Sequence, residues 1–233
     1  GLSGIETAKL ANHLGARVFA SDSGFSKRIS VHAMDLMHFH HIASETGLHS
    51  EKIYDADLWV LSPGVPKNAD IVIKAQEKNI PIVGEIEFAS WFTESPIVAV
   101  TGSNGKTTTA YILAEMCQSK NNHAVMAGNM GLPFSERVLN EIKTIDETRT
   151  YILEVSSFQM EFVYHFSPTI AVYTNLSIDH LDRHGSMEEY LKMKLRMIQN
   201  MDQEDCVVYN GDDPELVSAV ENQTVRLQPF STT

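Results

Sequence analysis

Short apolar segments alternate with stretches of helical periodicity along almost the whole chain. This alternation is typical of α/β proteins, in which crossover helices join the parallel strands of a sheet. Residues 71–78 have the pattern of a short helix. The apolar runs that we expect to be strands are 18–20, 58–61, 81–83, 97–101, 151–155, 170–174 and 206–209. The pattern therefore predicts an α/β fold with mostly parallel sheets.

A polar segment that ends in proline, Thr93 to Pro96, divides the chain. Residues 1–93 are predicted to form a Rossmann-like domain, and residues 94–233 a mononucleotide-binding α/β domain of the P-loop type. The first domain opens with the glycine-containing sequence 1–4, which leads directly into a helical pattern. Such a turn normally follows a strand, so we expect the first strand of this domain to lie upstream of residue 1.

The composition limits the partners that this chain is expected to have. Its formal net charge is −12, from 18 basic and 30 acidic side chains, so we expect no nucleic-acid partner and no membrane insertion. No apolar run approaches the ~20 residues that span a bilayer. Cys117 and Cys206 lie in apolar patterns without the spacing of metal or redox motifs. We therefore expect two buried thiols in a reducing cytoplasm.

The strongest local signal is a glycine-rich segment between a predicted strand and a predicted helix. It reads Gly-Ser-Asn-Gly-Lys-Thr-Thr at 102–108, and apolar residues with helical spacing follow it. Glycines let the backbone curl so that its N–H groups point at a phosphate, and the helix N-terminus adds partial positive charge. Lys106 is then placed to reach the β- and γ-phosphates, and the Thr107 hydroxyl to bind Mg²⁺. The general P-loop pattern has a glycine where this chain has Val100. We predict a nucleoside triphosphate site here, against an ordinary strand–turn–helix connection.

Glu154 interrupts the otherwise apolar predicted strand 151–155. Because a buried, unpaired carboxylate is costly, this side chain needs a cation or hydrogen-bond donors. We favour a Mg²⁺ ligand at the carboxyl end of a central strand, and the alternative is a solvent-facing carboxylate on an edge strand. A second polar cluster, at 179–184, follows the predicted strand 170–174 and suits either a metal and phosphate site or a solvated loop. Lys194 lies on the helix beyond it, where a lysine is more often on the surface.

Four histidines lie close together in the first part of the chain. Their spacing does not match that of known metal-binding helices, so we expect a solvated loop there, with a metal site as the alternative. They are His32, His38, His40 and His41.

Several stretches of this sequence, in this order, resemble the Mur ligases. They are SPGVP at 62–66, GEIEFA at 84–89, TGSNGKTTT at 101–109, GNMG at 128–131, LEVSSFQME at 153–161 and TNLSIDHLDRHGSMEEYLKMK at 174–194. The glycine-rich stretch alone also fits folylpolyglutamate synthetase. The SSFQ block followed by DHLDRH is most similar to the branch that adds D-glutamate to UDP-N-acetylmuramoyl-L-alanine. The resemblance implies an ATP-dependent amide ligase of peptidoglycan synthesis that forms an acyl-phosphate intermediate, a monomer of the bacterial cytoplasm.

The resemblance also implies roles for the matching residues. The catalytic residues would be Lys106, His180 and Lys194. ATP would be bound by Gly102, Ser103, Asn104, Gly105, Lys106, Thr107, Thr108 and Thr109. The UDP substrate would be bound by Leu2, Ser3, Asp22, Ser23, Ser62, Pro63, Gly64, Asn129 and Ser156. Two Mg²⁺ ions would be bound by Thr107, Glu154, His180 and Lys194, the last as a carbamate formed with CO₂.

Some features depart from the pattern of the family. The opening strand is missing, and Gly24 stands where some relatives carry a basic side chain. The family also has a third, C-terminal domain that binds the amino acid, so we expect this chain alone to turn over poorly or not at all. Alternatives are a sister Mur ligase, folylpolyglutamate synthetase, a dinucleotide-dependent oxidoreductase or a non-catalytic nucleotide-binding module. Residues 1–4 with Asp22 resemble half of a dinucleotide fingerprint, but an oxidoreductase has no use for the second glycine loop with Lys106.

Overall fold

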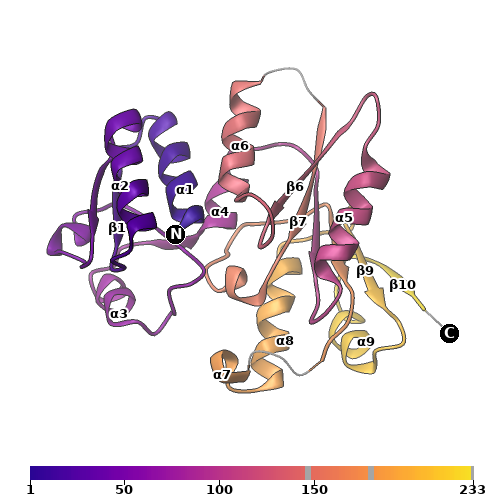
Figure 1. Cartoon of the computed structure of the whole chain (residues 1–233). Coiled ribbons are helices and arrows are strands. Elements are labelled where there is room, and N and C mark those ends of the chain that lie inside the picture. Colours follow the sequence, from indigo (N-terminus) through magenta and orange to yellow (C-terminus); the bar gives the residue numbers. More distant parts are fainter. Residues whose placement is uncertain (145–147, 178–180, 232–233) are drawn as a thin grey trace.

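The computed structural model describes residues 1–144, 148–177 and 181–231, without the side chains of residues 181 and 182. Six parallel strands of these residues form one sheet in the order β10-β9-β8-β5-β7-β6 (Figure 1). The strands are β5 (Ile97–Thr101), β6 (His123–Gly128), β7 (Arg149–Glu154), β8 (Ile170–Tyr173), β9 (Cys206–Asn210) and β10 (Arg226–Phe230). The predicted α/β class is confirmed, and each of the strands predicted for this part is present within two residues of its expected bounds.

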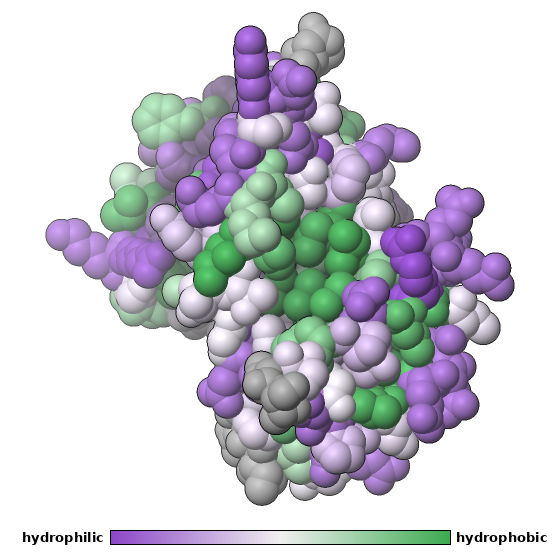
Figure 2. All heavy atoms as spheres, turned by 90° about the vertical axis from the view of Figure 1, so that its right-hand side faces the viewer, coloured by the Kyte–Doolittle hydropathy of each residue, from purple (hydrophilic) through white to green (hydrophobic). Residues whose placement is uncertain are grey.

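Helices cover the two faces of this sheet because side chains alternate between the faces along each strand. On β5, Val98 and Val100 face α5 (Lys106–Cys117), and Ile97 and Ala99 face the larger core. The helices that pack on the larger core include α6 (Phe134–Lys143), α8 (Met187–Leu195) and α9 (Pro214–Val220), with the short η3 (Arg196–Ile198). Apolar surface remains accessible on the side where α5 and β10 lie, as Figure 2 shows.

The first part of the chain contains two separate parallel ladders. Strand β1 (Phe19–Asp22) pairs with β2 (Ala43–Thr46), and β3 (Trp59–Leu61) pairs with β4 (Ile82–Gly84). The helices around them are α1 (Leu2–His13), α2 (Lys27–His40), η1 (Glu51–Tyr54) and α3 (Asp70–Glu77). The strands predicted at 18–20, 58–61 and 81–83 and the helix predicted at 71–78 are confirmed, with bounds shifted by one or two residues.

The histidine cluster does not lie in a solvated loop, so this prediction was wrong. Three of its members belong to α2, and the fourth, His41, ends that helix with a left-handed φ of 55°. The Ser26 side chain caps the helix by accepting a hydrogen bond from Ile29 N, and Leu36 packs against α1. Within the described residues, no group of three or more His, Cys, Asp and Glu side chains is arranged to hold a metal ion.

Helix α4 (Glu85–Ser90) connects the two parts of the chain. It follows β4 directly, and its residues Ile86, Phe88 and Ala89 belong to the core of the six-stranded sheet. Two buried carboxylates, on Glu85 and Glu87, come from the same short helix. Helix α4, together with α1, which packs on α6, therefore joins the first part to the second. In the part of the chain that the structure describes, no helix is long and apolar enough to cross a membrane.

Candidate active site

The glycine-rich loop connects β5 to α5, as the sequence predicts. Gly102 has a φ of +152°, and a Cβ at this position would lie 2.0 Å from Thr174 Oγ1, so only glycine fits. Gly105 has a φ of +80° and is the residue before α5 begins at Lys106. Helix α5 therefore starts with its N-terminal N–H groups at the carboxyl edge of a parallel sheet, where anionic ligands bind.

The segment after β8 holds this loop from the side. The Ser103 hydroxyl accepts a hydrogen bond from Ser177 N and donates one to Ser177 O, both at 2.9 Å. The Asn175 side chain accepts from Asn104 N at 2.9 Å and donates to Asn104 O at 3.0 Å. The Ser103 backbone N–H also donates to Asn175 O, at 3.1 Å, so both hydrogen-bond donors of Ser103 already have partners within the protein. The role of Asn175 was missed because its partner lies 71 residues away.

Lysines 106 and 194 meet at the same carbonyl of the loop. Lys106 Nζ donates to Gly102 O and to Ser103 O, each at 3.0 Å. Lys194 Nζ donates to Gly102 O at 2.9 Å and lies 4.6 Å from the centroid of the Tyr190 ring. Lys194 is only 2% exposed. A lysine on such a helix usually lies on the surface, but this one does not, because α8 directs its side chain beneath the loop.

Glu154 is buried on a central strand, so the edge-strand alternative is wrong. Strand β7 lies between β5 and β6, and Glu154 is 1% exposed. Its carboxylate accepts hydrogen bonds from Thr107 Oγ1 at 2.7 Å and from Asn129 Nδ2 at 2.8 Å. Gly128 permits this approach, because a Cβ there would lie 2.3 Å from Glu154 O. Three separate segments of the sequence thus meet at one carboxylate beside the loop.

The segment after β7 continues the site toward the first part of the chain. Ser156 N and Ser156 Oγ both lie within hydrogen-bond distance of Gln159 Oε1, which caps η2 (Ser157–Met160). Ser157 Oγ lies 2.9 Å from His184 Nε2 in the short α7 (Leu181–His184). His180, predicted as a catalytic and metal-binding residue, lies outside the described residues, as does Asp179. Because His184 and its neighbour Arg183 belong to a helix and have partners, the solvated-loop alternative does not apply to them.

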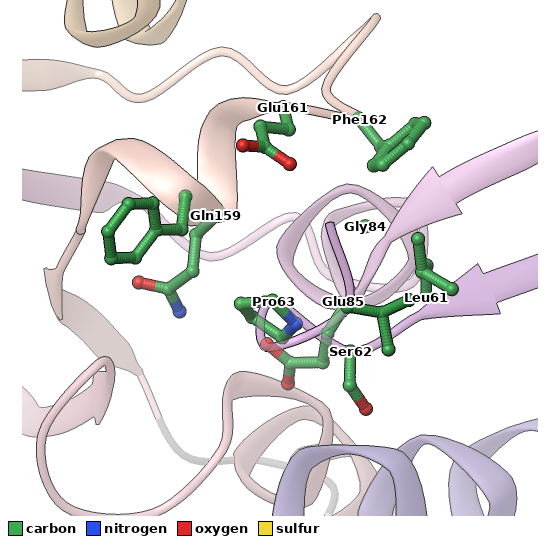
Figure 3. Close-up of a pocket in the computed structure, with 10 residues that line it drawn as sticks. Leu61, Ser62, Pro63, Gly84, Glu85, Gln159, Glu161 and Phe162 are labelled. Atoms are coloured by element: carbon green, nitrogen blue, oxygen red, sulfur yellow. The ribbon is translucent and has the colours of Figure 1, made fainter. Parts of the chain in front are cut away.

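The predicted substrate residues of the first part lie on two different elements. Ser62, Pro63 and Gly64 follow β3, and the first two line a small pocket together with residues of η2 (Figure 3). Leu2 and Ser3 lie in the first turn of α1. Asp22 ends β1 and Ser23 follows it, and Asp22 Oδ1 accepts from Gly24 N at 2.9 Å. The structure brings the Ser62 loop to the central part, and leaves Asp22 and Ser23 at the end of the separate β1–β2 ladder.

Glu85 is a buried carboxylate of this pocket to which the sequence analysis assigned no role. Figure 3 shows it beside Ser62 and Pro63. Its Oε1 accepts from Ser135 N at 2.7 Å, in the first turn of α6, where a carboxylate interacts favourably with the helix dipole. Burial nevertheless raises the pKa of this carboxyl above its ordinary value. Glu85 thus joins the connecting helix to the central part.

A glycine loop before a helix, with a buried carboxylate on the neighbouring strand, defines a mononucleotide-binding α/β protein. Comparison with known proteins gives the family. The model of the Mur ligase middle domain matches residues 100–233, and that of the MurD N-terminal domain matches residues 6–71. The first of these covers more than half of the chain, and the chain belongs to the Mur ligase family.

Named relatives agree with this assignment. The chain is 39% identical over 235 residues to the UDP-N-acetylmuramoylalanine–D-glutamate ligase of Christiangramia forsetii, covering 99% of this chain and 51% of that protein. It is 38% identical over 216 residues to the enzyme of the same name from Chloroherpeton thalassium, covering 91% and 45%. The chain thus spans about half the length of the curated relatives it matches.

Solved structures show the same fold at lower sequence identity. The crystal structure of a UDP-N-acetylmuramate:L-alanyl-γ-D-glutamyl-meso-diaminopimelate ligase from Neisseria meningitides has a TM-score of 0.62 at 17% identity, over 98% of this chain and 74% of that chain. The MurF ligase of Thermotoga maritima, solved in complex with ADP, has a TM-score of 0.52 at 19% identity, over 97% and 51%. At these identities the likeness concerns the fold alone.

Proposed function

We propose that this chain is part of an ATP-dependent amide ligase that joins D-glutamate to UDP-N-acetylmuramoyl-L-alanine in bacterial peptidoglycan synthesis. The observation that carries the proposal is the convergence of Thr107, Asn129 and Glu154 beside a glycine loop. The relatives named for this reaction, at 38–39% identity, support the choice of substrates. A reducing cytoplasm is the proposed location, in keeping with two free cysteines.

The oxygen donors at Glu154 fit Mg²⁺. A carboxylate and a hydroxyl lie 2.7 Å apart, and Mg²⁺ prefers hard oxygen ligands shared with nucleotide phosphates. We propose that Glu154 and Thr107 hold the ion, with His180 as a further ligand. When bound, Mg²⁺ would offset negative charge on the phosphates of ATP.

The proposed reaction has two steps. The alanyl carboxylate attacks the γ-phosphorus of ATP, so that ADP leaves and an acyl phosphate forms. The amine of D-glutamate then attacks the acyl carbon, loses a proton and displaces inorganic phosphate. In the first step, Lys106 and the N–H groups of the loop would stabilise charge on the transferring phosphoryl group.

The roles of the remaining site residues belong to the same proposal. The loop from Gly102 to Thr109 would bind ATP, and Asn129 and Ser156 would approach the muramoyl-alanine part. Leu2, Ser3, Asp22, Ser23 and the loop 62–64 would bind the uridine diphosphate part. Lys194 would carry a carbamate. A carbamate nitrogen keeps one N–H, which is compatible with the hydrogen bond to Gly102 O.

Calorimetric titration of the chain tests the substrate. We expect UDP-N-acetylmuramoyl-L-alanine to bind, with UDP-glucose and NAD⁺ as controls. Preferential binding of NAD⁺ would overturn the ligase proposal in favour of an oxidoreductase.

Titration with ATP and Mg²⁺ tests the loop. We expect Lys106→Ala to abolish binding, and Lys120→Ala, an exposed lysine beyond the same helix, to leave it unchanged. In the full-length protein, Lys106→Ala should also abolish D-glutamate-dependent phosphate release. Near-normal turnover of that variant would contradict the role of the loop.

A further inference from the structure

A partly buried ion pair lies where the first part of the chain meets the central part. Arg183 of α7 donates through Nε to Glu161 Oε1 at 3.2 Å and through Nη2 to Glu161 Oε2 at 2.9 Å. This is the two-pronged geometry that fixes both side chains in orientation as well as distance. Glu161 is 4% exposed and Arg183 19% exposed, so solvent screens the pair only weakly.

The same guanidinium also contacts the loop after β3. Arg183 Nη2 lies 3.4 Å from Pro63 O and 3.5 Å from Val65 O, two long and individually weak hydrogen bonds. Its Cζ lies 4.7 Å from the centroid of the Phe158 ring. The guanidinium is thus held between η2 and a loop that lies about 120 residues earlier in the sequence.

Orientation of these carbonyls determines what the loop offers to a ligand. In a planar trans peptide, the C=O of Pro63 and the N–H of Gly64 point in opposite directions. A Pro63 carbonyl turned toward Arg183 therefore turns the Gly64 N–H away from the positive charge. A backbone N–H in that direction is a donor that an anionic group can accept.

The other end of the ion pair leads to the proposed metal ligand. Glu161 ends the short segment that begins at Ser156, two residues after Glu154. Arg196 Nη1 donates to Glu161 O at 3.1 Å, which fixes this segment from a second side. A displacement of the loop at 63–65 would therefore move Arg183 and Glu161, and with them the segment that follows Glu154.

We propose that Arg183, oriented by Glu161, is a positioning residue that couples the loop at 63–65 to the nucleotide site around Glu154. This role rests on the proposed function, in which the loop holds the UDP substrate and Glu154 a Mg²⁺ ion. Arg183 touches neither ligand in this role. It makes the binding of one favour the binding of the other, and such coupling acts equally in both directions.

The test uses the full-length protein and the variants Arg183→Met, Arg183→Lys and Glu161→Gln. We expect Arg183→Met to raise the KM for the UDP substrate about tenfold, which is within the range typical of coupling between sites. ATP affinity measured without the UDP substrate should stay unchanged, and its increase upon addition of that substrate should be lost. Arg183→Lys keeps the charge without the fork and should fall in between. The KM of the double variant Arg183→Met/Glu161→Gln should be no higher than that of the single variants, because each substitution removes the same ion pair.

Lys192→Met provides the matched control, since it removes an exposed ion pair, with Glu189, from the neighbouring helix. It should change none of these quantities. An unchanged KM and unchanged coupling in Arg183→Met would overturn the positioning role. The positioning role would also be overturned if only kcat fell, in proportion to the fraction of folded protein. Failure of the unsubstituted protein to ligate D-glutamate would overturn the proposed function, a result seen before any variant is made.

Discussion

Substitution of Glu87 by glutamine removes one negative charge from the connection between α4 and the central part, with almost no change of shape. The carboxylate of Glu87 is fully buried. Its Oε2 accepts from Tyr164 N at 3.0 Å and from Phe166 N at 2.9 Å, and its Oε1 accepts from Trp91 Nε1 at 3.0 Å. His165 N lies within 3.1 Å of both oxygens. A glutamine amide has one acceptor oxygen and one NH₂ group, so it cannot satisfy donors on both sides.

The expected cost follows from counting the donors that lose their acceptor. If the NH₂ group replaces Oε2, the N–H groups of Tyr164 and Phe166 are left unpaired. If it replaces Oε1, the Trp91 indole N–H loses its acceptor. Each buried donor without an acceptor costs about 1–3 kcal/mol, so the expected cost is about 2 kcal/mol for one lost acceptor and about 4 kcal/mol for two. This is a large fraction of the roughly 5–15 kcal/mol by which a domain is stable.

Urea unfolding of this chain, followed by tryptophan fluorescence and by circular dichroism, measures the effect. Glu94→Gln is the control, because Glu94 is exposed and lies only seven residues away. We expect its free energy of unfolding to change by less than about 0.5 kcal/mol. A change of similarly small size in Glu87→Gln would refute the reasoning.

The pH dependence provides a second check on Glu87. Burial alone would raise the pKa of this carboxyl, but the N–H donors of residues 164 and 166 and of Trp91 hold it below its ordinary value of 4.5. A group with a lowered pKa in the folded state stabilises the protein above its unfolded-state pKa and loses this contribution as the pH falls through the folded-state pKa. The difference in free energy of unfolding between the unsubstituted chain and Glu87→Gln should therefore be largest at neutral pH and should shrink below about pH 4.5.

Three further predictions concern the site itself. Gly128→Ala should lower the free energy of unfolding by at least about 3 kcal/mol, because its Cβ would meet Glu154 O. Gly131 has open space around it, so Gly131→Ala should cost only about 1–2 kcal/mol. Equal effects of the two substitutions in urea unfolding would contradict the close approach at Gly128. Glu154→Gln should weaken Mg²⁺-dependent ATP binding in calorimetry by more than the roughly tenfold effect typical of outer-shell partners, and an unchanged affinity would remove Glu154 from the metal site. Burial raises the pKa of Glu85, so the contribution of this carboxyl to stability is present below pH 4.5 and is lost as the pH rises through its folded-state pKa. Glu85→Gln should therefore gain stability relative to the unsubstituted chain between pH 4 and pH 8. A difference in free energy of unfolding that does not depend on pH would contradict this.

The sequence by itself predicted the elements whose signals are contiguous. The strand at 97–101, the loop from Gly102 to Gly105 and the helix after Lys106 follow from glycine conformation and apolar spacing within about twenty residues. The burial of Glu154 was also foreseen, because a carboxylate within an apolar strand must find donors or a cation. These inferences hold because each depends on local chemistry that any fold containing the segment must respect.

Only the tertiary structure decided which distant side chains meet. Asn129 and Thr107 reach Glu154 because β6 and β5 are its neighbours in the sheet, an order that the sequence does not state. A lysine at such a helical position is more often on the surface, and only the family resemblance placed Lys194 at the site; the packing of α8 brings it under the loop. Arg183 and Glu87 each bind backbone groups more than seventy residues away. The partner of a buried charge is chosen by the packing of whole elements, because the stabilisation of the charge depends on desolvation and geometry that exist only once those elements have come together.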